Sequence, residues 1–456
     1  MKHKLFILSI AVMALFILQS TSDVSAYPWF ARRLVDNCNK CHVSFPKTND
    51  YGWYVKATGY ELPEMDYTGL EESPVKRFLR YLPMAVRFKV DAMNSNPSEM
   101  EGDLNIRAAQ LISGGSILNN RVSWWFHKHL MENNEFEKLF SGVPHEMWGQ
   151  YNFRFGKSDA TRVSVRYGMS ELPLRFSPSK TDISEVGYAI YNAMLGENAI
   201  MLGMPQYGAV LKGVKLGGDS YNQVRSTFDL ALVNGTGDFS SYDFTQVFAR
   251  VGTTVGSTMF GAFTYLGSKD LPMSMQMDGH ADEGDHHAEE GDMPADEHTD
   301  AVMTVGNNYL RVGLDFDLNV TPMFNIYGLG LYGRDSNPLG LEMGASGHYY
   351  GGFLGMDYSP TERFMITWRY DAVRFGNLPA MAHDEHADEG DAHSDEHAGG
   401  GGHMHGEMVT SNADAMVFGA NFLLPLPNYQ VRLTSEYLLG FRGLSDKLII
   451  GLQFAL

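Results

Sequence analysis

Cysteine is almost absent from this chain. Only 2 of its 456 residues are cysteines, Cys38 and Cys41, and His42 directly follows the second. Disulfide bonds are common in exported proteins. Here the only two thiols are separated by two residues and followed by an imidazole, a pattern that indicates a different chemistry.

Positive charge is also scarce. The chain has 35 lysines and arginines against 54 aspartates and glutamates, which gives a net charge of −19. A protein that binds a phosphate backbone needs a basic face. Nucleic acid is therefore not an expected partner.

Long apolar runs are missing, with one exception at the start. Lys2 and Lys4 precede an apolar run over residues 5–18, and small residues follow at 24–26. This pattern is typical of a secretory signal peptide, with cleavage expected after Ala26. A membrane anchor is the weaker interpretation, because a helical span needs roughly 20 apolar residues. No later run could form a spanning helix.

Helical periodicity is lacking as well, while glycine (48) and aromatic residues (12%) are abundant, which favours an all-β chain. From about residue 81 the sequence alternates strictly in short segments. In residues 309–320, apolar positions alternate with Arg311, Gly313, Asp315, Asp317 and Asn319. A soluble sandwich also alternates, but charged inner positions fit the wet lumen of a membrane barrel. Other charged residues expected to face the lumen are Arg87, Lys89, Arg154 and Arg166.

The connections between these segments alternate between short and long, as in outer-membrane barrels. Short links are expected at 156–161, 252–258, 319–324, 359–363 and 425–428, and long ones at 128–146, 169–206, 267–304, 334–347 and 376–413. Every long loop lies outside the cell if residues 81–456 form about 16 antiparallel strands. A strand at residues 186–195 would break this parity. We therefore expect residues 185–195 in a long outer loop, as a short helix folded into the lumen.

Two tracts rich in histidine and acid interrupt the barrel pattern, at residues 278–298 and 383–408. Both fall in the long outer loops and are too polar to fold alone. One interpretation is cation binding, since imidazole and carboxylate both take iron, zinc or copper. The other is solvated, disordered charge. The tracts contain ten histidines, namely His280, His286, His287, His298, His383, His386, His393, His397, His403 and His405.

The Cys-x-x-Cys-His motif is the strongest chemical signal in the chain. It indicates covalent attachment of one haem c through Cys38 and Cys41, with His42 as an axial ligand to the iron. A thioredoxin-like redox pair would need a βαβ context, and a zinc site would need further ligands nearby. Neither is present in the sequence.

The second axial ligand is open. Met65 is the nearest methionine, and methionine–histidine ligation is common in c-type cytochromes. It could equally be ordinary apolar filler. His127 and His129 are further candidates, although a position at the lumen or rim of the barrel is the more ordinary interpretation.

The segment that carries the motif, residues 27–80, is too short to bury much surface by itself. A haem needs protein on both faces. We therefore expect this segment to lie against or inside the barrel, whose inner wall would complete the pocket.

The first sixty residues resemble the N-terminus of the fused monohaem cytochrome–porin proteins of the bacterial outer membrane. Matching positions are Pro28, Phe30, Ala31, Arg32, Cys38, Cys41, His42, Phe45, Pro46, Asn49, Gly52, Gly59 and Tyr60. Thr48 and Tyr51 depart from the pattern, which expects leucine and phenylalanine there. The resemblance implies location in the outer membrane of a Gram-negative-type bacterium.

The same resemblance implies a function, because the family includes surface Fe(II) oxidases. These take electrons from Fe(II) and pass them to a periplasmic carrier. The departures at Thr48 and Tyr51 leave three alternatives open. The chain could conduct electrons outward, oxidise another donor, or be a diffusion porin with a haem plug or sensor.

Overall fold

A computed structural model shows the arrangement of most of the chain. It describes residues 40–44, 47–61, 74, 83–94, 103–132, 135–136, 145–156, 160–177, 184, 186–196, 198, 202–217, 223–235, 243–273, 303–341, 344–376, 409–426 and 429–455. The predicted signal peptide, Cys38, Met65 and both histidine-rich tracts lie outside these residues.

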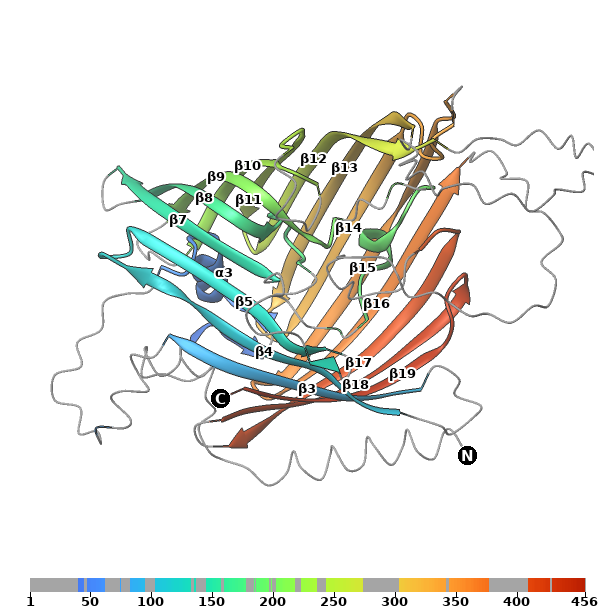
Figure 1. The fold of residues 1–456 in the computed structure, drawn as a ribbon. Coiled ribbons are helices and arrows are strands. Elements are labelled where there is room, and N and C mark those ends of the chain that lie inside the picture. The colour runs from blue at the N-terminus through green and yellow to red at the C-terminus, as the bar shows by residue number, and fades with distance from the viewer. Residues whose placement is uncertain are drawn as a thin grey trace, which may run out of the picture.

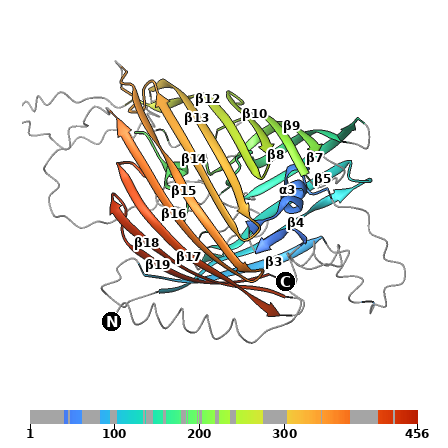
Figure 2. The same ribbon diagram turned by 180° about the vertical axis from the view of Figure 1, so that it is seen from behind.

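Within the described residues, sixteen long strands close into one antiparallel barrel (Figures 1 and 2), which confirms the predicted number. Each strand pairs with its neighbour in sequence, and the ring closes between the last strand and the first, where Phe454 faces Phe88. The strands are β3 (Met84–Asn94), β4 (Asp103–Ile117), β5 (Val122–Glu132), β7 (Glu146–Phe155), β8 (Thr161–Glu171), β9 (Pro205–Gly217), β10 (Gln223–Val233), β11 (Gln246–Val255), β12 (Thr258–Pro272), β13 (Thr304–Thr321), β14 (Phe324–Asp335), β15 (Gly347–Thr361), β16 (Phe364–Gly376), β17 (Ala413–Leu426), β18 (Tyr429–Arg442) and β19 (Lys447–Ala455). A two-residue strand, β6 (Glu135–Phe136), pairs antiparallel with the end of β5.

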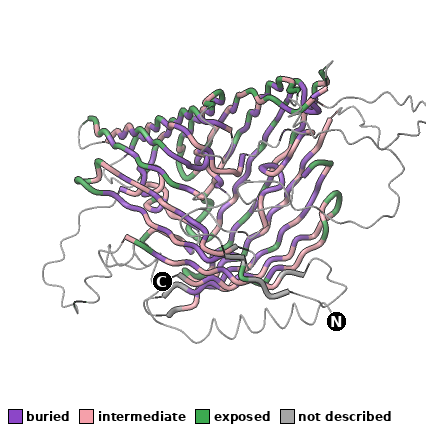
Figure 3. The backbone as a smooth tube through the Cα atoms, in the orientation of Figure 1, coloured by how far each residue is buried: buried purple, intermediate pink, exposed green. Residues whose placement is uncertain are grey.

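Burial along the strands is the reverse of that in a soluble protein (Figure 3). On β13, Leu314 is 66% exposed while its neighbour Asp315 is only 3% exposed. The apolar side chains face outward and the charged ones inward. Such a surface is stable only against lipid, with a polar lumen inside. The chain is therefore an outer-membrane-type β-barrel.

Charged side chains of the inner wall neutralise one another. Lys212 lies 2.5 Å from Asp229, and Arg250 lies 2.7 Å from Asp315. A buried charge without a partner would cost several kcal/mol, so the pairing allows this wall to exist. Further pairs are Arg311–Asp335, Arg369–Asp371 and Arg374–Asp414.

The connections follow the predicted alternation of short and long. The turns at 256–257, 322–323 and 362–363 each join consecutive strands with two residues, whereas β12 and β13 are joined by residues 273–303 and β16 and β17 by 377–412. The two histidine-rich tracts fall in these two long connections. The loop parity read from the sequence is confirmed.

The connection between β8 and β9, which we call the luminal loop, turns into the barrel. It contains a short 3-10 helix, η3 (Ala189–Asn192), as expected for residues 185–195. Ile190 and Tyr191 are each 1% exposed and pack in one apolar cluster with inward-facing strand residues such as Tyr327 and Phe353. The luminal loop thus fills part of the lumen.

Residues 40–61, which we call the motif segment, also lie inside the ring of strands. They form a small hairpin of β1 (His42–Ser44) and β2 (Lys47–Thr48), followed by helix α3 (Asp50–Ala57). Figures 1 and 2 show α3 within the barrel, near one end. Ala57 packs on Val214, Leu216 and Val224 of β9 and β10. None of the described helices is long and apolar enough to span a membrane.

Candidate functional site

The candidate site is the motif segment, which contains Cys41 and His42. Asn49 joins the cysteine loop to the helix. Its backbone N–H donates to the carbonyl of Cys41 (2.9 Å), and its side-chain amide donates to the carbonyl of Lys40 (3.1 Å). Its side-chain oxygen accepts the N–H of Gly52 at 2.9 Å and so caps the start of α3. One residue, through its backbone and its side chain, therefore fixes the angle between the cysteine loop and the helix.

Gly52 allows α3 to pack directly on the cysteine loop. A Cβ atom at this position would lie 2.1 Å from the carbonyl oxygen of Cys41, which is a backbone atom that cannot move aside alone. Glycine is the only residue that fits here without a backbone shift. Local packing and hydrogen bonding thus explain why the matched sequence pattern has asparagine at position 49 and glycine at position 52.

Replacing Gly52 with alanine should separate the helix from the cysteine loop. Overpacking of this kind costs about 1–3 kcal/mol. We expect faster proteolysis of residues 40–61 in the folded barrel and less haem bound per chain. Gly149→Ala is the matched control, because a Cβ at Gly149 would meet no atom within 4 Å. Equal effects from both substitutions would contradict the proposed contact.

The end of α3 turns the chain toward the barrel wall. Gly59 and Tyr60 both adopt left-handed backbone conformations, with φ of 77° and 66°. Their N–H groups donate back to the carbonyls of Lys56 and Val55, at 3.3 and 2.7 Å, which closes the helix as a Schellman motif. A left-handed tyrosine costs about 1–2 kcal/mol. Packing of its ring on the wall offsets this cost.

Tyr60 forms an aromatic stack with two tryptophans of the inner wall. Its ring centre lies 4.8 Å from that of Trp125 on β5 and 5.9 Å from that of Trp148 on β7, with the planes within 17° and 11° of parallel. The guanidinium of Arg166 lies 3.7 Å from the centre of the Trp148 ring. This stack joins the motif segment to two barrel strands.

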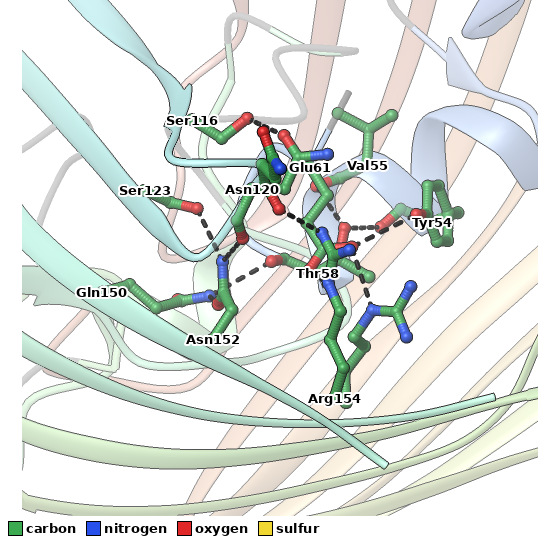
Figure 4. Close-up of polar contacts among 12 residues, drawn as sticks. Tyr54, Val55, Thr58, Glu61, Ser116, Asn120, Ser123, Gln150, Asn152 and Arg154 are labelled. Atoms are coloured by element: carbon green, nitrogen blue, oxygen red, sulfur yellow. Dashed lines mark hydrogen bonds and ion pairs between the residues drawn. The ribbon is translucent and has the colours of Figure 1, made fainter. Parts of the chain in front are cut away.

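A buried ion pair also attaches the C-terminal end of the motif segment to the barrel wall (Figure 4). Glu61 is 2% exposed, and its carboxylate lies 3.0 Å from Nε of Arg162 and 3.7 Å from Nε of Arg154. The hydroxyl of Tyr54 donates to it at 3.4 Å, and burial together with this carboxylate raises the pKa of Tyr54. Nε2 of Gln150 on β7 donates to the carbonyl of Thr58 at 3.1 Å.

The hairpin end of the segment meets the opposite wall. Lys47 lies 3.8 Å from Asp357 on β15. Burial lowers the pKa of Lys47, and the nearby Asp357 partly opposes this by favouring the charged ammonium. The segment is thus attached at both ends, to strands on different sides of the lumen.

The luminal loop contacts the motif segment. The guanidinium of Arg175 lies 4.0 Å from the ring centre of Trp53 on α3, and it also pairs with Asp317 on β13. A cavity of about 400 Å³ remains between the loop, the segment and the wall, lined among others by Thr48 and Trp53. Thr48 is the strand partner of His42. The cavity therefore opens beside the hairpin that contains His42.

These features fit the predicted haem. Cys41 and His42 are half-buried in a loop that is fixed to α3 and to the wall, with a cavity alongside. Cys38 and Met65 lie outside the described residues, so the thiol pair and the methionine ligand stay predictions. The same holds for the ten loop histidines.

The two alternative ligands, His127 and His129, lie in the inner wall of β5 and are each 4% exposed. Their rings adjoin that of His145, which sequence reasoning missed. The described residues contain no group of three or more histidine, cysteine, aspartate and glutamate side chains already arranged to hold a metal ion.

Comparison with known proteins finds similarity among solved structures only. It matches no protein-family model and no curated protein sequence. Among solved structures it is similar to the anion-selective porin of Comamonas acidovorans, with a TM-score of 0.48 and 10% identity over 82% of this chain and 98% of the porin. It is also similar to the outer-membrane channel DcaP of Acinetobacter baumannii (TM-score 0.44, 9% identity, 82% and 96% covered) and to OmpT of Vibrio cholerae (TM-score 0.45, 8% identity, 82% and 97% covered). The likeness is one of general barrel form, and nothing about selectivity carries over from these channels.

Proposed function

We propose that this protein is an outer-membrane electron conduit that oxidises Fe(II) at the cell surface. It passes the electrons through one c-type haem to a periplasmic carrier. The observation that carries the proposal is the position of the motif segment. The peptide that contains Cys41 and His42 is attached inside the barrel by buried contacts at both ends. A peptide fixed inside the lumen obstructs it, which favours a conduit over an open pore for diffusion.

The haem, when bound, supplies one-electron transfer at its iron. Cys38 and Cys41 would hold it covalently, His42 would ligate it, and Met65 is the candidate for the other face. The residues around the site keep it in place. Asn49 fixes the cysteine loop to α3, and the aromatic stack and the ion pair of Glu61 keep α3 against the wall.

The proposed reaction transfers one electron from each Fe(II) ion to one carrier molecule. One Fe(II) becomes Fe(III) outside, and one oxidised carrier is reduced in the periplasm. The Fe(III) product is insoluble near neutral pH, which is a reason to oxidise iron on the outer side. The two histidine-rich tracts could raise the local concentration of Fe(II) at the mouth, because carboxylate and imidazole both bind it.

The direct test of the donor is reduction of the purified protein by Fe(II), followed optically over a range of pH. We expect the haem spectrum to change from oxidised to reduced on adding Fe(II). A protein reduced readily by dithionite or a sulfur compound, but by Fe(II) at no pH tested, would exclude iron as the donor. An outward conduit or an oxidase of another donor would then remain.

A further inference from the structure

Three histidine side chains lie close together at the inner wall of the barrel. His127 and His129 are alternate residues of β5, and His145 directly precedes β7. Their ring centres form a nearly equilateral triangle, with sides of 5.1, 5.0 and 5.1 Å. We call these residues the histidine cluster.

The size of this triangle matches that of a three-histidine metal site. A zinc–nitrogen bond is about 2.0–2.1 Å, so an imidazole centre lies about 3.2 Å from the metal, and two such centres at a tetrahedral angle lie about 5.2 Å apart. The observed sides agree with this spacing.

The nitrogen atoms have yet to turn toward a common point. Nε2 of His129 now lies 2.7 Å from Nε2 of Gln110. Rotation about the Cβ–Cγ bond is soft for histidine and turns the nitrogens while leaving the ring centre almost in place. Gln110 would keep its other contact, in which its side-chain oxygen accepts a hydrogen bond from Arg87. Closing the site therefore requires ring rotation, because the planes of His129 and His145 now lie within 8° of parallel.

The surroundings favour a cation at this position. Glu146 is 0% exposed, follows His145 directly and is the strand partner of His127. One of its carboxylate oxygens accepts the backbone N–H of Glu171 at 3.2 Å. A buried carboxylate beside the cluster offsets the charge of a divalent ion, and imidazole is a preferred ligand of first-row metals from iron to zinc.

We propose that His127, His129 and His145 bind one first-row divalent transition-metal ion in the inner wall of the barrel. The site includes neither Cys41 nor His42, and it assigns His127 and His129 to this ion rather than to the haem. It lies next to the aromatic stack, since His127 is two residues from Trp125 on the same face of β5. A metal held there would adjoin the residues that attach the motif segment.

The test uses zinc, because its X-ray absorption edge is unaffected by haem iron. The full-length protein is first changed at its ten loop histidines to glutamine, since these could bind zinc independently. This loop variant should retain one zinc per chain after dialysis against buffered Zn(II). Its zinc-edge spectrum should show imidazole nitrogens at about 2.0–2.1 Å.

Three single substitutions are then made in the loop variant: His127→Gln, His129→Gln and His145→Gln. Each should weaken zinc binding by about tenfold or more. His348→Gln is the matched control, because His348 lies on β15 with its ring beside Tyr332. His145→Gln guards against misfolding, as this residue lies outside the strands, and circular dichroism checks that each barrel forms. A loop variant that binds no zinc, or a triple variant that still binds one per chain, would overturn the proposal.

Discussion

A protein with alanine at both Cys38 and Cys41 is expected to contain no covalently bound haem at all. Each thiol is predicted to form one bond to the haem, so removing both would leave no link that survives denaturation. Haem staining of a denaturing gel should show a band for the unaltered chain and none for the double variant. Barrel assembly should be unchanged, because the barrel strands pair without help from either cysteine.

His42→Ala separates attachment from ligation. It leaves both thiols in place, so the stained band should remain while the absorption spectrum of the folded protein loses its normal axial ligation. A stained band in the double cysteine variant would remove the haem assignment. So would a His42→Ala protein with an unaltered spectrum.

Loss of the Glu61 carboxylate is expected to release one end of the motif segment and open the lumen. Glu61→Gln leaves Arg162 buried beside Arg154 without the carboxylate that both face. Removing one partner of a buried ion pair typically costs about 3–5 kcal/mol. This cost falls on the contact between segment and wall, whereas the strands of the barrel keep their backbone hydrogen bonds.

Single-channel conductance in a planar bilayer measures the result. The unaltered protein should conduct poorly, because the motif segment and the luminal loop both occupy the lumen, and Glu61→Gln should raise the conductance several-fold. Asp315→Asn is the matched control, since it disrupts a buried pair with Arg250 that joins parts of the barrel wall to each other. A conductance that Glu61→Gln leaves unchanged would mean that this pair does not keep the segment in place.

Much of the barrel could be predicted because membrane strands follow a simple rule. Lipid outside and water inside force a period of two, so Leu314 and Asp315 alternate in the sequence as they do in space. The parity of short turns and long loops then fixed the number of strands. Parity also excluded a strand at 186–195, and η3 was found there inside the lumen.

The details of the site could not be predicted in the same way. The motif predicts a haem, but nothing in the sequence pairs Glu61 with Arg162 or brings Tyr60 onto Trp125 and Trp148. Such contacts depend on the direction in which the helix leaves its left-handed end. His145 was missed because it lies in the connection before β7, where no periodic pattern indicates which side chains face inward.

The most direct test of the conduit is electron transfer across a closed membrane. The purified protein is placed in liposomes that contain an oxidised soluble c-type cytochrome, and Fe(II) is added outside with a chelator inside to capture any iron that leaks. We predict that the trapped cytochrome is reduced, with one Fe(III) formed outside for each cytochrome reduced inside. Liposomes with the double cysteine variant should show no reduction. No reduction by the unaltered protein, or equal reduction by both proteins, would contradict the account.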